Sequence, residues 1–262
     1  MNTIVISGYK SFIGQNFLNN YKNKYRIIHY RKDINNQYQF LKFTKKFSFD
    51  YFIHFAALSR NKCDLNKNLC QKTNFRGVKL IVDTFNLLKN KPRFIFISSS
   101  HVYGNSKYKL KENSVTKPKS LYAKLKLKSE NYIKKKYINY SILRLFNVYG
   151  KNQPSGYFIS DMTDKIKNNQ TIKIDKSIRD FVNVNTVSRV INFIIMNDIL
   201  GIINVGSGRG YSLKSIINQI GVKLKMKPLL IVLNKKTKIV ADLKLLKEKG
   251  FKFKQNEKNL NI

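Results

Sequence analysis

A tyrosine and a lysine four residues apart, Tyr122 and Lys126, lie downstream of a serine cluster at Ser98–Ser100. Residues i and i+4 of a helix share a face, so the Lys126 ammonium can lie beneath the Tyr122 phenol. A nearby cation favours the phenolate, which lets the tyrosine exchange protons closer to neutral pH. Together with a serine hydroxyl, this pair can move a proton on and off a sugar or steroid oxygen beside a nicotinamide. A helical tyrosine over a solvated lysine is the structural alternative.

The first residues of the chain have the pattern of a dinucleotide-binding turn. The run Thr3–Ser7 is followed by Gly8-x-x-Ser11-x-x-Gly14 and then by a helical pattern. Glycines allow a tight turn and a close approach of the backbone, and the helix N-terminus receives the pyrophosphate. A serine stands where a third glycine is expected. We therefore predict cofactor contacts along this turn, at Gly8, Lys10, Ser11, Phe12, Ile13 and Gly14.

Motifs farther along the chain resemble those of the NAD-dependent epimerase/dehydratase family, the extended short-chain dehydrogenases/reductases that act on nucleotide sugars. They follow the family's order and extend over nearly the whole chain. These motifs are Asp50–Ala57, Thr73–Gly77, Phe94–Gly104, Glu112 with Pro118, Tyr122 and Lys126 with Glu130, Leu143–Gly150, Arg179–Val184, Ile203–Gly208 and Asp242–Phe251. Each motif alone is a weak signal, whereas their common order is not a coincidence.

The resemblance implies roles for individual residues. Tyr122 would be the acid/base, Lys126 its partner and ribose anchor, and Ser99 would hydrogen-bond the substrate oxygen. Asn147 and Arg179 would bind the substrate diphosphate, because arginine offers a planar, charged fork to phosphate oxygens. Further cofactor contacts are expected at Ala56, Ala57, Asn74 and Ser98, and a further substrate contact at Ser100. No metal site is expected.

Some positions favour a structural role or depart from the family pattern. His54 lies in an apolar run and is interpreted as a satisfied structural histidine, and His101 as an ordinary loop histidine. Asn185 and Thr186 stand where the family usually carries an aspartate. This departure puts the capping of the following helix in question.

Strand-like runs alternate with helical segments, which predicts an α/β fold with a Rossmann-like, doubly wound parallel sheet and a smaller C-terminal substrate-binding lobe. We assign residues 1–150, with a return segment at about 179–205, to the dinucleotide-binding domain. Residues 151–178 and 206–262 would form the substrate lobe, and Asn256–Ile262 is expected to fray. The strand-like runs are Ile4–Ser7, Arg26–His29, Tyr51–Ala56, Arg93–Ser98 and Tyr140–Leu145.

The end of the second predicted strand favours NADP(H), with NAD(H) as the alternative. An NAD site needs a carboxylate there for the ribose hydroxyls, whereas NADP needs cations around its 2′-phosphate. The strand ends in His29-Tyr30-Arg31-Lys32 and carries no acid at its tip. Lys10, inside the glycine turn, is placed to help Arg31 and Lys32 bind the phosphate.

Several reactions are compatible with the serine, tyrosine and lysine. We favour a 4-ketoreductase of an NDP-4-keto-6-deoxysugar, and then an NDP-sugar 4-epimerase with tightly bound NAD. A 4,6-dehydratase is disfavoured because Ser99-Ser100-His101 lacks the carboxyl groups that water elimination needs. A basic, non-catalytic Rossmann module that binds RNA is a further alternative, although Ser99, Tyr122 and Lys126 are all retained.

The composition constrains the partners of the protein. With 51 Lys+Arg against 14 Asp+Glu, the formal net charge is +37. The lysines are scattered along the chain, so we attribute the charge to an AT-rich coding bias and consider nucleic-acid binding unlikely. No run is long enough for a membrane segment, and we expect a cytoplasmic enzyme that acts on a nucleotide sugar. Cys63 and Cys70 are interpreted as buried or free thiols, and the Tyr122 helix as a candidate homodimer interface.

Overall fold

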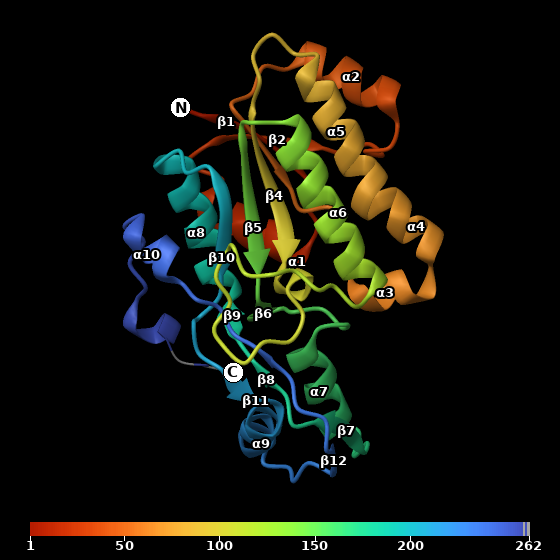
Figure 1. The fold of residues 1–262 in the computed structure, drawn as a ribbon, viewed down its shortest axis with the longest axis vertical. Coiled ribbons are helices and arrows are strands. Elements are labelled where there is room, and N and C mark those ends of the chain that lie inside the picture. The colour runs from red at the N-terminus through yellow and green to blue at the C-terminus, as the bar shows by residue number, and fades with distance from the viewer. Residues whose placement is uncertain (259, 261–262) are drawn as a thin grey trace. The chain divides into compact units, whose positions relative to one another are not determined.

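The computed structural model describes residues 1–258 and 260 (Figure 1). The described chain divides into two compact units. Unit 1 comprises Met1–Val102, Pro118–Arg144 and Ser188–Ile203, and unit 2 comprises the intervening segments and the C-terminal part of the chain from Asn204 onward. Each unit has its own apolar core, and each is described separately below.

A parallel sheet forms the centre of unit 1. Its strand order is β10-β5-β4-β3-β1-β2, and the pairs β1–β2, β1–β3 and β3–β4 are parallel. After β1 the chain forms β2 on one side and then crosses to β3 on the other, which makes the carboxyl ends of β1 and β3 a ligand-binding switch point. The strand bounds are β1 Thr3–Ser7, β2 Arg26–Tyr30, β3 Tyr51–His54, β4 Arg93–Ser99, β5 Tyr140–Leu145 and β10 Gly201–Val205.

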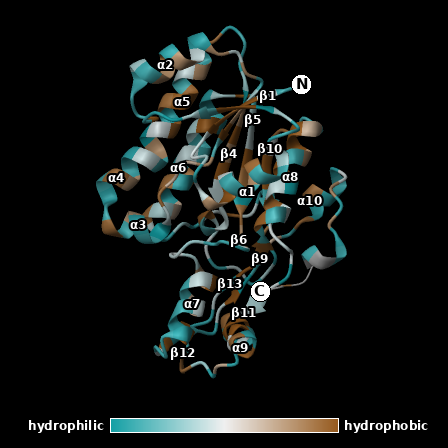
Figure 2. Cartoon of the chain, turned by 180° about the vertical axis from the view of Figure 1, so that it is seen from behind, coloured by the Kyte–Doolittle hydropathy of each residue, from teal (hydrophilic) through white to brown (hydrophobic). Residues whose placement is uncertain are grey.

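Helices cover both faces of this sheet (Figures 1 and 2). Helices α5 and α6 lie on one face, over a core of phenyl rings from Phe52, Phe85 and Phe94. Helices α1 and α8 lie on the other face. The bounds are α1 Phe12–Tyr21, α2 Gln37–Lys46, α3 Arg60–Leu65, α4 Lys67–Gln71, the π-helix η1 Lys72–Arg76, α5 Gly77–Asn86, the 3-10 helix η2 Ser100–Val102, α6 Leu121–Lys136 and α8 Val184–Met196.

Unit 2 has a smaller core in which α7, α9 and β7 contribute most of the side chains. Ile172 and Ile174 of β7 pack there with Ile216, Ile217 and Ile220 of α9. Three helical segments belong to this unit, namely α7 Phe158–Lys167, α9 Leu213–Leu224 and α10 Lys244–Glu248, together with η3 Gln255–Lys258, among the described residues. Its strands are β6 Asn147–Tyr149, β7 Ile172–Asp175, β8 Ile178–Arg179, β9 Phe181–Asn183, β11 Tyr211–Ser212, β12 Leu230–Leu233 and β13 Lys238–Ile239.

The predicted α/β fold class is confirmed. Strands β1 to β5 begin and end within two residues of the five predicted runs, whereas β10 was not among the predicted strands. The predicted domain boundaries stay a prediction; the units of the structure place residues 103–117, 145–150 and 179–187 in unit 2. The departure at Asn185 is compensated locally, because the Asn183 side chain accepts the Asn185 N–H at 2.9 Å, at the start of α8. Of the tail expected to fray, residues 259, 261 and 262 lie outside the described residues.

No helix in the described part of the chain is long and apolar enough to cross a membrane.

Candidate active site

Helix α6 presents Tyr122 and Lys126 from one face at its N-terminal end. Ser120 begins the helix, and its side chain accepts the Ala123 N–H. Tyr122 is partly exposed in the first turn, whereas Lys126, one turn later, is only 3% exposed. The Lys126 Nζ donates to the Ile97 carbonyl at 2.6 Å and lies 5.9 Å from the centre of the Tyr122 ring. Burial lowers the pKa of Lys126 to about 7, although the Glu130 carboxylate raises it.

A buried ion pair supports the helix below the lysine. Arg144 of β5 donates from Nη2 to Glu130 Oε2 at 2.6 Å, and both side chains are almost fully buried. The Ser98 hydroxyl donates to the other Glu130 oxygen. Ser98, a predicted cofactor contact, therefore has its hydroxyl directed at α6 in this structure. The two motif residues Glu130 and Arg144 are linked to each other, which their separate motifs do not reveal.

Ser99 ends β4, and His101 follows in η2, where its ring contacts Tyr122. The Ser99 Oγ accepts the His101 N–H at 3.3 Å. The His101 ring contacts the Tyr122 ring edge-on, with centroids 6.2 Å apart and planes at 88°. Ser100, a predicted substrate contact, is buried within η2. The interpretation of His101 as an ordinary loop histidine missed this contact; its position two residues after Ser99 was the available signal.

The glycine turn links the ends of β1 and β3 to helix α1. Gly8 has φ +71°, and a Cβ there would lie 2.3 Å from the Ala56 backbone nitrogen. Any side chain at this position would therefore push the two strand ends apart. Ser11 stands before α1, and its side chain accepts the Gly14 N–H at 3.2 Å. The predicted pyrophosphate contacts at the start of this helix stay predictions. Phe12 and Ile13 form the first turn of α1, and Ala57 is exposed after Ala56.

Cations gather around an aromatic stack at the tip of β2. The Tyr9 ring of the glycine turn stacks on His29, with centroids 4.5 Å apart and an angle of 5°. The Arg31 guanidinium and the Lys10 ammonium lie 5.9 Å and 6.0 Å from the centre of the Tyr9 ring. Burial and the nearby Arg31 charge lower the pKa of His29. The sequence indicated Lys10 and Arg31 but gave no sign of the Tyr9–His29 stack.

The first acid after β2 is already engaged. Asp33 accepts the Asn35 backbone N–H at 2.9 Å and pairs with Lys72 at 3.5 Å. Its pKa is lowered mainly by the hydrogen bonds from Asn35, so it is a carboxylate at neutral pH. Lys32, next to it, is exposed.

Asn74 connects the loop after β3 with two cysteines. Its Oδ1 accepts the Leu58 N–H at 2.8 Å, and its Nδ2 lies 3.4 Å from the Cys63 sulfur. Cys63 and Cys70 form a disulfide. The prediction of burial is confirmed for both, but the interpretation as free thiols was wrong, because α3 and α4 bring the two side chains together. Asn74 itself is buried.

His54 is buried at the end of β3. Its Nδ1 lies 2.7 Å from the Ser7 hydroxyl, but its buried Nε2 has no hydrogen-bond partner, so the ring is not fully satisfied as predicted. Burial lowers the pKa of His54 to about 3, with a smaller effect of Lys126 in the same direction. The imidazole is therefore neutral at physiological pH.

In unit 2, the two predicted diphosphate ligands take part in the local fold. Asn147 Nδ2 donates to the Asp180 carbonyl at 2.8 Å. The Arg179 guanidinium donates to the Ile178 carbonyl and to the Thr237 hydroxyl, at 2.9 and 2.6 Å. The roles of Asn147 and Arg179 toward a substrate stay predictions.

The aspartate next to Arg179 organises the same region. The buried Asp180 carboxylate accepts backbone N–H groups of Ser207, Gly208 and Ala241 at 2.7 to 3.1 Å. A Cβ at Gly206 would lie 2.6 Å from this carboxylate. Two motifs far apart in the sequence therefore meet at Asp180.

Comparisons with known proteins place the chain in a family. Residues 4–206 match the model of the NAD dependent epimerase/dehydratase family. A putative UDP-glucose 4-epimerase of Methanocaldococcus jannaschii is 32% identical over 169 residues, which are 58% of this chain and 55% of that protein. The chain thus matches about half the length of this curated relative.

Solved structures share the fold at low sequence identity. UDP-glucose 4-epimerase of Thermus thermophilus in complex with NAD has a TM-score of 0.83 at 17% identity, over 95% of this chain and 93% of that one. The dTDP-4-dehydrorhamnose reductase of Bacillus anthracis in complex with NADP has a TM-score of 0.84 at 19% identity, over 95% and 92%.

The protein belongs to the NAD dependent epimerase/dehydratase family, because the family model covers most of the chain. The predicted family and the doubly wound fold are thereby confirmed, and a nicotinamide dinucleotide is the cofactor that the family's name implies.

Proposed function

We propose that the protein is an NADP(H)-dependent 4-ketoreductase of an NDP-4-keto-6-deoxysugar. The observation that carries this proposal is the group of cations at the tip of β2, where Lys10 and Arg31 lie about 6 Å from the centre of the Tyr9 ring. A 2′-phosphate is recognised by such cations, whereas an adenosine ribose with a free 2′-hydroxyl needs a carboxylate. Asp33, the first acid after the strand, is engaged by Asn35 and Lys72. A reductase that consumes NADPH fits this arrangement.

The residues of unit 1 divide the reduction between them. When bound, the dinucleotide supplies a hydride to the carbonyl carbon of the sugar. Tyr122 donates its phenolic proton to the carbonyl oxygen, which becomes the new hydroxyl. In its protonated form, the Lys126 side chain, whose pKa is lowered to about 7, stabilises the resulting phenolate. Ser99 holds the carbonyl oxygen by a hydrogen bond. Unit 2, with Asn147 and Arg179, is the proposed substrate lobe.

His101 is a candidate positioning residue for Tyr122. Its ring meets the Tyr122 ring edge-on, and its backbone N–H is bound by the Ser99 hydroxyl. The three residues therefore form one connected group. We expect His101 to orient Tyr122 against the substrate.

A 4-epimerase is the second candidate, favoured by the name of the relative from Methanocaldococcus jannaschii. Such an enzyme removes the hydride and returns it to the other face of the sugar. It needs the same tyrosine, lysine and serine, but keeps its NAD throughout the reaction. The two reactions differ in whether reduced cofactor is consumed.

The test is incubation of the purified protein with NADPH or NADH and a panel of 4-keto-6-deoxy and ordinary nucleotide hexoses. We expect loss of the nicotinamide absorbance with NADPH and one or more 4-keto sugars. Bound NAD together with interconversion of nucleotide hexoses, without net oxidation of the cofactor, would instead identify the epimerase. Salt-sensitive RNA binding without either activity would favour the non-catalytic module.

A further inference from the structure

An exposed apolar stripe lies on the outer face of unit 2. Residues of a strand alternate between its faces, and Leu230 of β12 packs on the unit 2 core. Ile231 and Leu233 belong to the opposite face and are 45% and 52% exposed. Val232 and Leu229, the residue before β12, are also 38% and 51% exposed. Large aliphatic side chains exposed together in this way mark an interaction surface.

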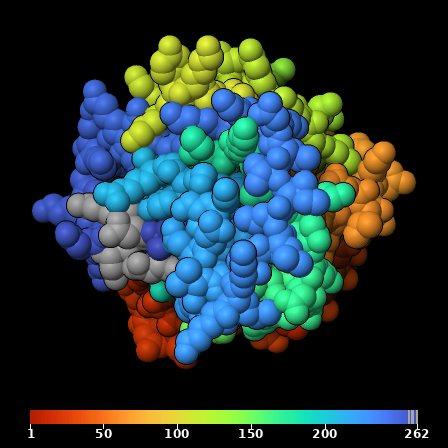
Figure 3. All heavy atoms as spheres, turned by 90° about the horizontal axis from the view of Figure 1, so that it is seen from below, coloured from red at the N-terminus to blue at the C-terminus, as the bar shows by residue number. Residues whose placement is uncertain are grey.

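Lysines border this stripe on β7 and on the segments before and after β12. The parallel pairing of β12 with β7 places Ile231 beside Lys173, which is exposed. Exposed lysines also flank β12 along the chain, at Lys225, Lys227, Lys235 and Lys236. Figure 3 views this surface of unit 2, with the blue α9 and β12 segments facing the reader.

The charge of this region has one sign along the chain. From Ile199 to Ala241 the sequence carries eight lysines and arginines and no acidic residue. The Asp175 carboxylate at the end of β7 accepts the Ser177 N–H at 3.1 Å and so stabilises the turn that follows the strand. The surface is thus aliphatic at its centre and cationic at its rim.

We propose that the β12 face is a docking surface for an anionic lipid bilayer. Aliphatic side chains can enter the boundary between headgroups and acyl chains, while lysines bind anionic headgroups. A second copy of the chain fits less well, because it would bring an equally cationic rim against the first. Nucleic acid would use the lysines but gains little from aliphatic side chains, since single strands stack on aromatic ones.

The test is co-sedimentation of the full-length protein with vesicles. Vesicles of phosphatidylcholine alone are compared with vesicles that also contain phosphatidylglycerol, at low and at high salt. We expect binding to the anionic vesicles only, weakened by salt. The double variant Ile231→Ser/Leu233→Ser should bind at least about tenfold more weakly, and Lys235→Gln/Lys236→Gln several-fold more weakly.

Matched controls separate this surface from the general positive charge. Lys45→Gln/Lys46→Gln removes the same charge from α2, and Leu65→Ser/Leu87→Ser removes exposed leucines from unit 1. Both controls should bind vesicles like the native protein. The proposal is overturned if the native protein ignores anionic vesicles, or if the Ile231→Ser/Leu233→Ser variant binds them as well as the native protein. Tight binding of a single-stranded RNA, with no vesicle binding, would assign the lysines to nucleic acid instead.

Discussion

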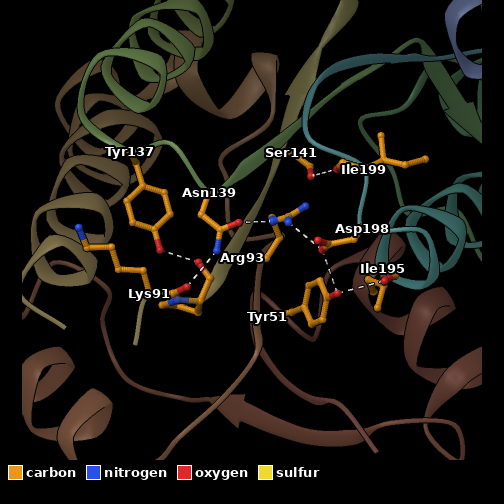
Figure 4. Close-up of polar contacts among 10 residues, drawn as sticks. Tyr51, Lys91, Arg93, Tyr137, Asn139, Ser141, Ile195, Asp198 and Ile199 are labelled. Carbon is orange, nitrogen blue, oxygen red and sulfur yellow. Dashed lines mark hydrogen bonds and ion pairs between the residues drawn. The ribbon is translucent and has the colours of Figure 1, made fainter. Parts of the chain in front are cut away.

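The two ends of the unit 1 sheet use their polar side chains differently. At the amino ends of the strands, the side chains join neighbouring elements to one another (Figure 4). Arg93 of β4 pairs with Asp198 after α8 at 2.7 Å and also donates to Asn139 before β5. Tyr51 of β3 donates to the Ile195 carbonyl at 3.0 Å. These contacts are directed inward and hold β3, β4 and the end of α8 together.

At the carboxyl ends, cationic side chains lie beside β2 and β4, and the Glu130 carboxylate acts on Lys126. Lys10 and Arg31 share the Tyr9 ring, and the buried Lys126 has a lowered pKa. Gathering like charges is unfavourable unless an anion joins them. At the amino end, polar side chains are paired with other groups of the protein, whereas at the carboxyl end we propose that a phosphorylated ligand binds.

The largest effect is expected from removing the proposed acid. Tyr122→Phe should lower turnover by roughly 100- to 10,000-fold, the usual contribution of general acid catalysis, with the fold unchanged. Tyr51→Phe at the amino end is the matched control and should leave turnover intact while lowering the free energy of unfolding by about 1 kcal/mol. Steady-state kinetics and denaturant unfolding measure both. Full activity of Tyr122→Phe would show that another group supplies the proton.

The buried ion pair beneath the site should dominate stability. Glu130→Gln leaves the Arg144 guanidinium buried without its carboxylate, so we expect a loss of about 3–5 kcal/mol in the free energy of unfolding. Asp64→Asn breaks the exposed ion pair with Arg60 and should change the free energy of unfolding by less than about 1 kcal/mol. Urea unfolding of the two variants checks the difference. If the two variants lost the same free energy of unfolding, the buried ion pair would be no more important to stability than the exposed one.

Lys126 should make stability depend on pH. In the unfolded chain the lysine stays protonated up to its ordinary pKa of 10.5, whereas in the folded protein it loses its proton near pH 7. Between these values the unfolded state binds more protons, so raising the pH favours folding. From pH 7 to 9 the native protein should gain up to about 1.4 kcal/mol per pH unit relative to Lys126→Met. A constant difference across this range would mean that Lys126 titrates normally.

A substitution at the amino end of the sheet should lower the free energy of unfolding less than Glu130→Gln does, and should not lower turnover. Arg93→Met removes the partner of Asp198, but that carboxylate is 69% exposed and can be hydrated. We therefore expect a loss of about 1–2 kcal/mol in the free energy of unfolding and nearly native turnover. A collapse of activity in a folded Arg93→Met variant would remove the functional distinction between the two ends.

Much of the fold could be predicted because its signals are local. Apolar strand runs and the glycine turn are readable along the chain, and Tyr122 and Lys126 share a face simply because they are four residues apart on one helix. The NADP(H) preference was inferred from residue types at one strand end, and it stays a prediction.

What could not be predicted depends on pairings between distant segments. The Tyr9–His29 stack joins two strand ends, and the Cys63–Cys70 disulfide depends on how α3 and α4 meet. Asp180 belongs to the Arg179–Val184 motif, but the motif did not reveal that its carboxylate binds backbone N–H groups of Ser207 and Gly208 in unit 2. A motif identifies a residue type at a position, but only the folded chain shows what that residue contacts.

The most direct test of the central claim is the affinity of the protein for NADP⁺ and NAD⁺, measured by titration calorimetry. We expect NADP⁺ to bind at least about tenfold more tightly, a difference of about 1.4 kcal/mol. Lys10→Ala/Arg31→Ala should lose this preference, whereas Lys45→Ala/Lys46→Ala, which removes the same charge elsewhere, should keep it. Equal or tighter binding of NAD⁺ by the native protein, or a preference that survives in Lys10→Ala/Arg31→Ala, would contradict the account.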